Sequence, residues 1–350
     1  MLDIQQIRDA IQPLDTERMR EAQVRLDSLT KPPGSLGRLE KIARQIVGIT
    51  GELFPDLSRK AVIIMAADHG VCEEGVSAYP QAVTAQMVLN FLNGGAAVNV
   101  VARHVGAEIV CVDIGVKAPI QHPGLISHKI RHGTGNAARG PAMQEQEAWQ
   151  AIRTGLDAVQ SLVRQGYRLF ATGEMGIGNT TPSSAILSVL EGVDVEAAVG
   201  RGTGINDRQL RLKKQVVRRM IEVNRPDPQN PFDVLCKIGG LEIAGLVGVI
   251  LGAAANRCPV VIDGFISSAA ALLAARLAPR SVEYMIPSHL SGEQGHRLML
   301  EAIGVEPMLQ MDMRLGEGTG AALCFPIIDA ALKLMREMAT FESAGISKVE

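Results

Sequence analysis

The chain has 350 residues, of which 47% are hydrophobic, 3% are aromatic and 36 are glycine. Such a length, with so many small and aliphatic residues, favours an α/β enzyme with tight turns, and the scarcity of rings argues against a protein that stacks nucleic-acid bases. A net charge of −2 gives no overall attraction to nucleic acid or to an anionic membrane.

Cysteine usage and hydropathy predict a cytoplasmic protein without a membrane span. The five cysteines are scattered with no C-x-x-C pair, which indicates neither a disulfide framework nor a zinc site. The N-terminus carries Asp3, Arg8 and Asp9 and lacks the apolar core of a secretory signal. The most apolar stretch, 243–255, contains three glycines and is too short to cross a bilayer.

Helical patterns occupy both ends of the chain. Residues 1–50 give two of them, around a turn-rich segment at 29–37, and residues 321–350 are helical with no strand after them. We therefore expect the two ends to pair as a small helical domain beside a large α/β domain, 51–320, that carries the loops of the site. The segment 224–231 contains three prolines and is predicted to be a surface connection.

Between the two ends, short runs of strand character alternate with helical patterns. Each run leads into a turn that holds glycine or polar side chains, and the runs are 61–66, 108–112, 167–171, 259–262, 282–286 and 307–315. This alternation predicts a mostly parallel sheet covered by helices. Because the carboxyl ends of parallel strands meet at one edge, we expect the turns to converge on one crevice there.

The turn after the first run holds Asp68 and His69. The pair is typical of a metal site or an acid–base pair, but no second ligand follows at helical spacing. A structural aspartate that accepts hydrogen bonds from turn amides is at least an equal alternative. The next segment, 77–87, either lines a pocket for a flat organic ligand or is ordinary loop and core. Three histidines in 122–132 stand at uneven spacing among polar residues, which favours a solvated loop.

Two glycine-rich loops are candidates for binding phosphate. The first, 173–181, follows a strand and precedes a helical pattern, and free N–H groups at a helix N-terminus suit phosphate or ribose. It lacks the Gly-Lys-Ser/Thr of a Walker loop, and a plain connecting turn is the alternative. The second, 200–204, precedes a basic helix with Lys213 and Lys214, either of which is a candidate phosphate partner or simply part of a solvated cationic face.

Glu317 stands between glycines in the turn that follows the last run, and we predict that it is a catalytic base. The surrounding 316–321 formally fits a dinucleotide-binding fingerprint, but one helix follows and then the chain ends, so the second strand of that motif is missing. The Ser288–His289 pair suggests nucleophilic catalysis, yet the G-x-S-x-G elbow of that chemistry does not occur in the sequence.

Together these segments resemble the nicotinate-nucleotide–dimethylbenzimidazole phosphoribosyltransferase family over nearly the whole chain. The motifs that carry the resemblance are KPPGSLGRLE at 31–40, ADHGV at 67–71, GEMGIGNTT at 173–181, DGF at 263–265, PSH at 287–289 and RLGEG at 314–318. Each motif alone is weak, whereas this many in order is specific.

The resemblance implies a homodimer with a Rossmann-like parallel sheet and a small helical domain built from both termini. It implies transfer of phosphoribose from nicotinate mononucleotide to 5,6-dimethylbenzimidazole or a related base, which releases nicotinate and forms α-ribazole 5′-phosphate for the nucleotide loop of cobalamin. It gives Glu317 as the base and Glu174 as a second carboxylate near the reacting carbon. The implied phosphoribosyl contacts are Gly176, Thr180, Gly202, Lys213, Asp263 and Ser291. The implied base pocket is Tyr79, Met87, Met175 and Leu315.

Three positions of that pocket depart from the family pattern. Tyr79 and Met87 stand where some relatives carry serine and glutamine, and Met175 stands in place of a leucine. Bulkier and softer side chains reshape the slot, so our hypothesis is that the enzyme accepts a broader set of bases.

Neither a metal nor a cofactor is expected, because the cationic pyridinium of nicotinate mononucleotide is already a good leaving group.

Two other classes of protein remain as alternatives. A nucleotide-binding oxidoreductase is disfavoured because the second strand of the dinucleotide-binding motif is missing. A hydrolase is disfavoured because the G-x-S-x-G motif does not occur. A non-catalytic nucleotide-binding regulator would keep the glycine loops but would not need the carboxylate of Glu317. Replacement of Glu317 by alanine separates the regulator from the transferase.

Overall fold

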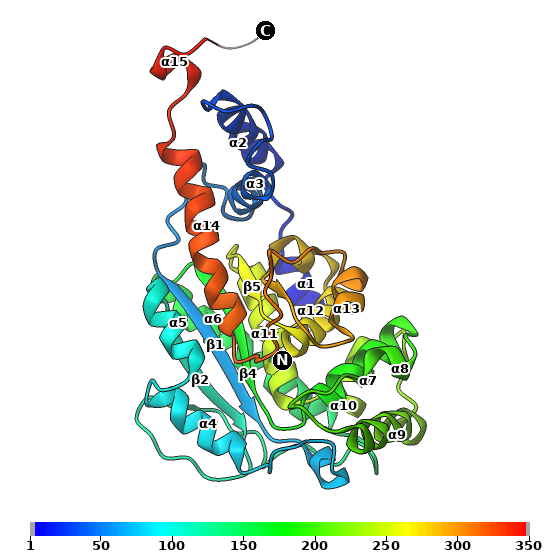
Figure 1. The fold of residues 1–350 in the computed structure, drawn as a ribbon. Coiled ribbons are helices and arrows are strands. Elements are labelled where there is room, and N and C mark those ends of the chain that lie inside the picture. The colour runs from blue at the N-terminus through cyan, green and yellow to red at the C-terminus, as the bar shows by residue number, and fades with distance from the viewer. Residues whose placement is uncertain (1–3, 348–350) are drawn as a thin grey trace.

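A computed structural model describes residues 4–347, and at its centre lies a six-stranded parallel sheet (Figure 1). Its order, β3-β2-β1-β4-β5-β6, is that of a doubly wound dinucleotide-binding sheet. The strands are β1 Lys60–Ala67, β2 Glu108–Gly115, β3 Ile126–Ser127, β4 Leu169–Met175, β5 Val260–Ile262 and β6 Met285–Pro287. The predicted mostly parallel α/β sheet is confirmed.

The helices of the described residues cover both faces of this sheet. In chain order they are α1 Ile4–Ala10, α2 Thr16–Ser28, α3 Arg38–Thr50, η1 Gly70–Glu74, α4 Val83–Leu92, α5 Ala97–Val105, α6 Glu145–Arg164, α7 Thr180–Glu191, α8 Val195–Ala198, α9 Asp207–Asn224, α10 Pro231–Ile238, α11 Leu241–Ala255, α12 Phe265–Leu277, η2 Pro279–Tyr284, α13 His296–Ile303, α14 Thr319–Glu337 and α15 Phe341–Ala344.

Strand β1 shows why its sequence run is continuously apolar. Every residue of it is buried, and successive side chains point to opposite faces. Ile63 and Met65 belong to the core shared with α6 and α11. Val62 and Ile64 belong to the core shared with α3, α5 and α14. A strand with a helical layer on each face has no polar side, and so the sequence shows no alternation.

Two predicted strands differ from the structure. Of 307–315 only β8, Leu309–Gln310, is a strand, and it pairs with β7, His289–Leu290, outside the central sheet. The chain leaves the extended conformation at Asp312, whose φ is 53°. Of 282–286 most lies in η2, and β6 begins only at Met285. Pro279 fits the first turn of this 3₁₀ helix because it has no N–H to satisfy.

The two ends of the chain meet along α14. Helices α2 and α3 pack together and against α14, and Figure 1 shows them beside the C-terminal half of α14. Leu29 forms a bridge with Thr340, and the guanidinium of Arg25 donates to the carbonyls of Met335 and Met338 at 3.0 and 2.9 Å. Helix α1, a third helix where the sequence suggested two in this region, instead packs against α11 of the main body.

Helix α14 also reaches the sheet. Its first half contacts β4 and β5, so one continuous helix connects the terminal helices to the carboxyl edge of the strands. No helix within residues 4–347 is both long and apolar enough to cross a membrane.

Candidate active site

Three carboxylates meet at the carboxyl edge of the sheet, beside the point where the strand order reverses between β1 and β4. Glu174 lies near the end of β4, Asp263 follows β5, and Glu317 precedes α14. Glu174 Oε1 accepts the backbone N–H of Glu317 at 3.2 Å. Asp263 accepts the N–H groups of Gly318 at 3.1 Å and Ala321 at 2.9 Å. Both acids therefore hold the backbone on which Glu317 is carried.

The turn around Glu317 has an unusual backbone. Gly316, Glu317 and Gly318 have φ of 83°, 66° and 89°, and a non-glycine residue in this region costs about 1–3 kcal/mol. A Cβ at 316 would collide with Glu174 Oε1, and one at 318 would lie 2.5 Å from Val62 Cγ1. The two glycines are thus required by space as well as by conformation. Strain of this kind collects at functional sites.

Burial sets the protonation of both glutamates. Glu317 is 7% exposed, and burial, followed by the charge of Asp263, raises its pKa to about 7. Burial is also the main cause that raises the pKa of Glu174 to about 8, against the lowering effect of the Glu317 N–H. Near neutral pH Glu317 is therefore poised between its two forms, which suits a general base.

The predicted phosphate contacts come together on the neighbouring loops. Lys213, fully buried on α9, donates from Nζ to Thr180 Oγ1 at 2.7 Å and to the Gly200 carbonyl at 3.3 Å. Gly202 has a φ of 51°, and a Cβ there would lie 2.7 Å from Thr180 Oγ1. Burial lowers the pKa of Lys213 to about 8, and Glu293 opposes that shift.

Asn179, which the sequence did not single out as a site residue, joins the carboxylates to this lysine. Its side-chain amide donates to Glu174 Oε2, and its neighbour Thr180 is bonded to Lys213. Asn179 occupies the N-cap position of α7 but makes no capping bond, so its side chain is used for Glu174 instead. Its place inside the glycine motif was visible in the sequence, but the turn that brings its amide back to Glu174, five residues earlier, was not.

Ser291 lies beside the second glycine loop. Its hydroxyl accepts the N–H of Glu293 at 3.3 Å, and a Cβ at Gly200 would collide with the Glu293 carboxylate. The loop that holds Ser291 and the loop that holds Gly202 are therefore in contact. Gly292 donates to the carbonyl of Met313 at 2.9 Å, which ties the same loop to the segment leading to Glu317.

The structure separates the predicted base pocket into two pairs. Met175 is buried at the end of β4, and Met87 packs against the same apolar cluster from α4. Tyr79 and Leu315 are 56% and 55% exposed, and the structure brings neither into that cluster.

Asp68 and His69 have distinct partners. Asp68 accepts the N–H of Lys117 at 2.7 Å, as a structural aspartate does. His69 Nε2 lies 2.6 Å from Glu242 Oε1, and both groups are buried. A Cβ at Gly176 would lie 3.1 Å from that histidine nitrogen, so the pair lies directly against the first glycine loop. No cluster suited to a metal ion occurs among residues 4–347.

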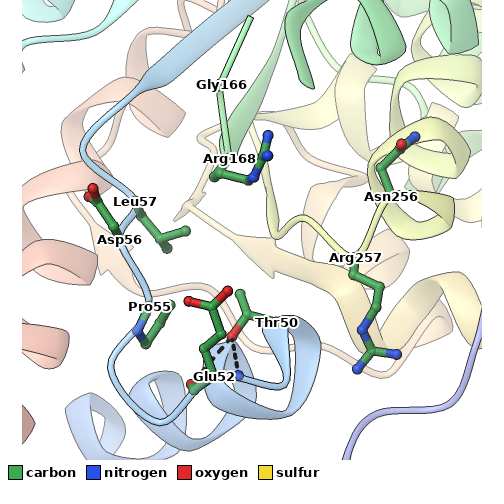
Figure 2. Close-up of a pocket in the computed structure, with 9 residues that line it drawn as sticks. All are labelled: Thr50, Glu52, Pro55, Asp56, Leu57, Gly166, Arg168, Asn256 and Arg257. Carbon is green, nitrogen blue, oxygen red and sulfur yellow. Dashed lines mark hydrogen bonds between the residues drawn. The ribbon is translucent and has the colours of Figure 1, made fainter. Parts of the chain in front are cut away.

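A hollow of about 370 Å³ lies elsewhere, at the amino ends of β1, β4 and β5 (Figure 2). Its arginines already donate to backbone carbonyls, Arg168 to Val163 at 2.8 Å and Arg257 to Gly48 at 2.9 Å. It is on the opposite edge from Glu317 and takes no part in the chemistry assembled there.

A family model described as "Phosphoribosyltransferase" matches residues 11–346, so the chain belongs to a class of transferases that handle a phosphorylated sugar. A relative from Geotalea uraniireducens (strain Rf4), named nicotinate-nucleotide–dimethylbenzimidazole phosphoribosyltransferase, is 55% identical over 97% of each chain. One of the same name from Desulforamulus reducens is 56% identical over 97% of each. The chain belongs to the nicotinate-nucleotide–dimethylbenzimidazole phosphoribosyltransferase family, which confirms the resemblance read from its motifs.

A solved structure agrees with this assignment. The crystal structure of the enzyme of that name from Thermus thermophilus superimposes with a TM-score of 0.91 at 44% identity and covers 96% of this chain and 100% of its own.

Proposed function

We propose that this protein transfers phosphoribose from nicotinate mononucleotide to 5,6-dimethylbenzimidazole or a related base. The products are α-ribazole 5′-phosphate and nicotinate, for assembly of the nucleotide loop of cobalamin. The names of its relatives support this reaction. The observation that carries the proposal is Glu317, a buried carboxylate with a pKa of about 7 on a strained turn held by Glu174 and Asp263.

In the reaction we propose, a ring nitrogen of the base attacks the anomeric carbon of the ribose while the bond from that carbon to the pyridinium nitrogen breaks. The electron pair of that bond neutralises the pyridinium and nicotinate leaves. Glu317 takes the N–H proton of the incoming base. Attack opposite the leaving group inverts the anomeric carbon from β to α, and the carboxylate of Glu317 favours the oxocarbenium-like charge that develops there.

Lys213 and Thr180 supply the binding site for the 5′-phosphate. A buried ammonium that bonds a threonine hydroxyl and a carbonyl still has a third N–H to donate. The positive end of α7, which begins at Thr180, adds to the attraction for an anion. Gly176, Gly202, Asp263 and Ser291 complete the set of phosphoribosyl contacts.

The base lies on the methionine side of the site. Met87 and Met175 supply a flexible, polarizable wall, and the exposed side chains of Tyr79 and Leu315 close over the ligand when it binds. A wall of this kind adapts to more than one ring system, so acceptance extends to other benzimidazoles or phenolic bases. The protein acts in the cytoplasm, as its scattered cysteines indicate, and it forms a homodimer, as the family resemblance implies.

The test is incubation with nicotinate mononucleotide and a panel of bases, with products resolved by mass spectrometry. Formation of a ribosyl phosphate of dimethylbenzimidazole together with free nicotinate supports the reaction. Absence of any base adduct would refute it. In paired competition between two bases, a sharp preference for dimethylbenzimidazole alone would count against the broad specificity.

A further inference from the structure

His296 makes two hydrogen bonds inside the protein. Its side chain is fully buried at the start of α13. Nδ1 lies 2.8 Å from the backbone nitrogen of Ser291, and Nε2 lies 2.9 Å from Ser268 Oγ. Because the backbone N–H donates, Nδ1 carries no proton, and Nε2–H donates to the serine hydroxyl. Burial, followed by the nearby His289, lowers the pKa of His296 to about 3, so this neutral arrangement persists at ordinary pH.

The bond to Nδ1 fixes a loop that touches both halves of the site. Beyond Ser291 the chain donates from Gly292 to Met313, on the segment that leads to Glu317. The next side chain, Glu293, lies against Gly200, whose carbonyl accepts from Lys213. The loop that carries Ser291 therefore lies directly against the phosphate side and contacts the carboxylate side through the segment before Glu317.

The Ser291 amide depends on this one acceptor. Ser291 is buried, and a buried N–H that loses its acceptor retains the full cost of its desolvation. The bond from Nε2 to Ser268 joins α13 to α12 and does not reach the loop. The two ring nitrogens of His296 thus have separable consequences.

We propose that His296 is a positioning residue which, through Nδ1, holds the backbone of Ser291 where the phosphoribosyl group of the donor nucleotide binds. Its effect on the ligand rests on the proposed function, whereas its effect on the loop does not. Neither ring nitrogen touches the reacting atoms.

Two conservative variants separate the effects of the two ring nitrogens of His296. In His296→Asn the amide oxygen is as many bonds from Cβ as Nδ1 and can accept the Ser291 N–H. In His296→Gln the side-chain amide reaches the position of Nε2, so it keeps the hydrogen bond to Ser268 and loses the one to the Ser291 N–H. We expect the Kd for nicotinate mononucleotide to rise roughly tenfold or more in H296Q and to stay within about threefold of wild type in H296N. In both, kcat at saturating nucleotide changes less than Kd.

Hydrogen exchange of the unliganded proteins over 288–296 provides a second readout, with faster exchange expected in H296Q only. Tyr284→Phe is the matched control. Tyr284 is buried just before β6, and its hydroxyl donates to the Gln12 carbonyl at 2.8 Å, so the variant also removes one buried hydrogen bond. We expect it to leave Kd unchanged. Equal effects in H296N and H296Q, in Kd and in exchange, would overturn the proposal.

Failure of the proposed function has a different signature. A wild-type protein that neither binds nicotinate mononucleotide nor forms a base adduct would refute that function and the ligand part of this inference. The exchange comparison would still decide whether Nδ1 positions the loop.

Discussion

Glu317 combines the two properties that a general base requires, a position fixed by its neighbours and a pKa near neutrality. The position comes from a backbone that only flanking glycines and two hydrogen-bonding acids allow. The pKa comes mainly from burial and then from the charge of Asp263. A carboxylate on the surface would have neither property, because its side chain would move freely and its pKa would lie far below neutral pH.

The raised pKa of this one residue predicts how the rate depends on pH. A base must be ionised to accept a proton, so kcat/KM should rise with pH and level off above about 7, where Glu317 loses its proton. The rate should be measured from about pH 5.5 to about pH 9 with saturating base, a range that brackets this ionisation. A flat profile through this range would show that the ionisation of Glu317 does not limit the reaction. Lys213, whose pKa is about 8, is expected to produce a decline at the alkaline end as the phosphate site loses its charge.

At the scale of elements, the ends of strands and the starts of helices carry most of the residues of the candidate site. Strand β4 delivers Glu174, the start of α7 delivers Thr180, and the turn before α14 delivers Glu317. Close approach of these elements depends on glycine. Gly173 lies so near this turn that a Cβ there would be 2.7 Å from the Glu317 carbonyl oxygen.

Substitution of Gly318 tests this packing. Alanine at 318 would adopt a φ of 89° and meet Val62 Cγ1 at 2.5 Å, whereas alanine at Gly304, with a φ of 82°, would meet nothing within 4 Å. We expect G304A to lose about 1–2 kcal/mol of unfolding free energy from conformation alone. G318A should lose about 1–3 kcal/mol more from overpacking, together with most of its activity. Denaturant unfolding of both variants measures the difference, and equal losses would contradict it.

At the scale of the whole molecule, the sequence reveals what is local and misses what depends on distant partners. Strands β1 and β4 are buried throughout and β2 is buried from Cys111 to Gly115, so these three strands could be predicted from apolar runs. The run at 307–315 looks like them, but its strand pairs with the two-residue β7 outside the central sheet, and the chain turns at Asp312. The bonds of His296 to Ser268 on α12 and of Lys213 to Thr180 at the start of α7 join different helices, and no local pattern indicates them.

The buried acids also affect the stability of the whole fold. The ordinary pKa of Glu174 is 4.5, and in the folded protein it is raised to about 8. Between these values the unfolded chain releases a proton that the folded protein keeps, so the free energy of unfolding should fall as pH rises and level off above about 8. This contribution is fully present below pH 4.5 and is lost by about pH 8.

Glu174→Gln removes this titration while keeping a neutral group of the same shape. We expect the variant to gain stability relative to wild type by a few kcal/mol between about pH 5 and about pH 8, since one pKa unit corresponds to about 1.4 kcal/mol. Thermal or urea unfolding at the two pH values provides the comparison. A difference between variant and wild type that is the same at both would contradict the raised pKa.

The central claim is that Glu317 accepts the proton of the incoming base, and Glu317→Gln tests it most directly. Product formation from nicotinate mononucleotide and dimethylbenzimidazole should be measured together with nucleotide binding by calorimetry, using Glu342→Gln, at an exposed site, as the control. We predict that kcat falls about 10²- to 10⁴-fold in E317Q while the Kd of the nucleotide stays within about threefold of wild type. Turnover by E317Q at the rate of the control would contradict this claim.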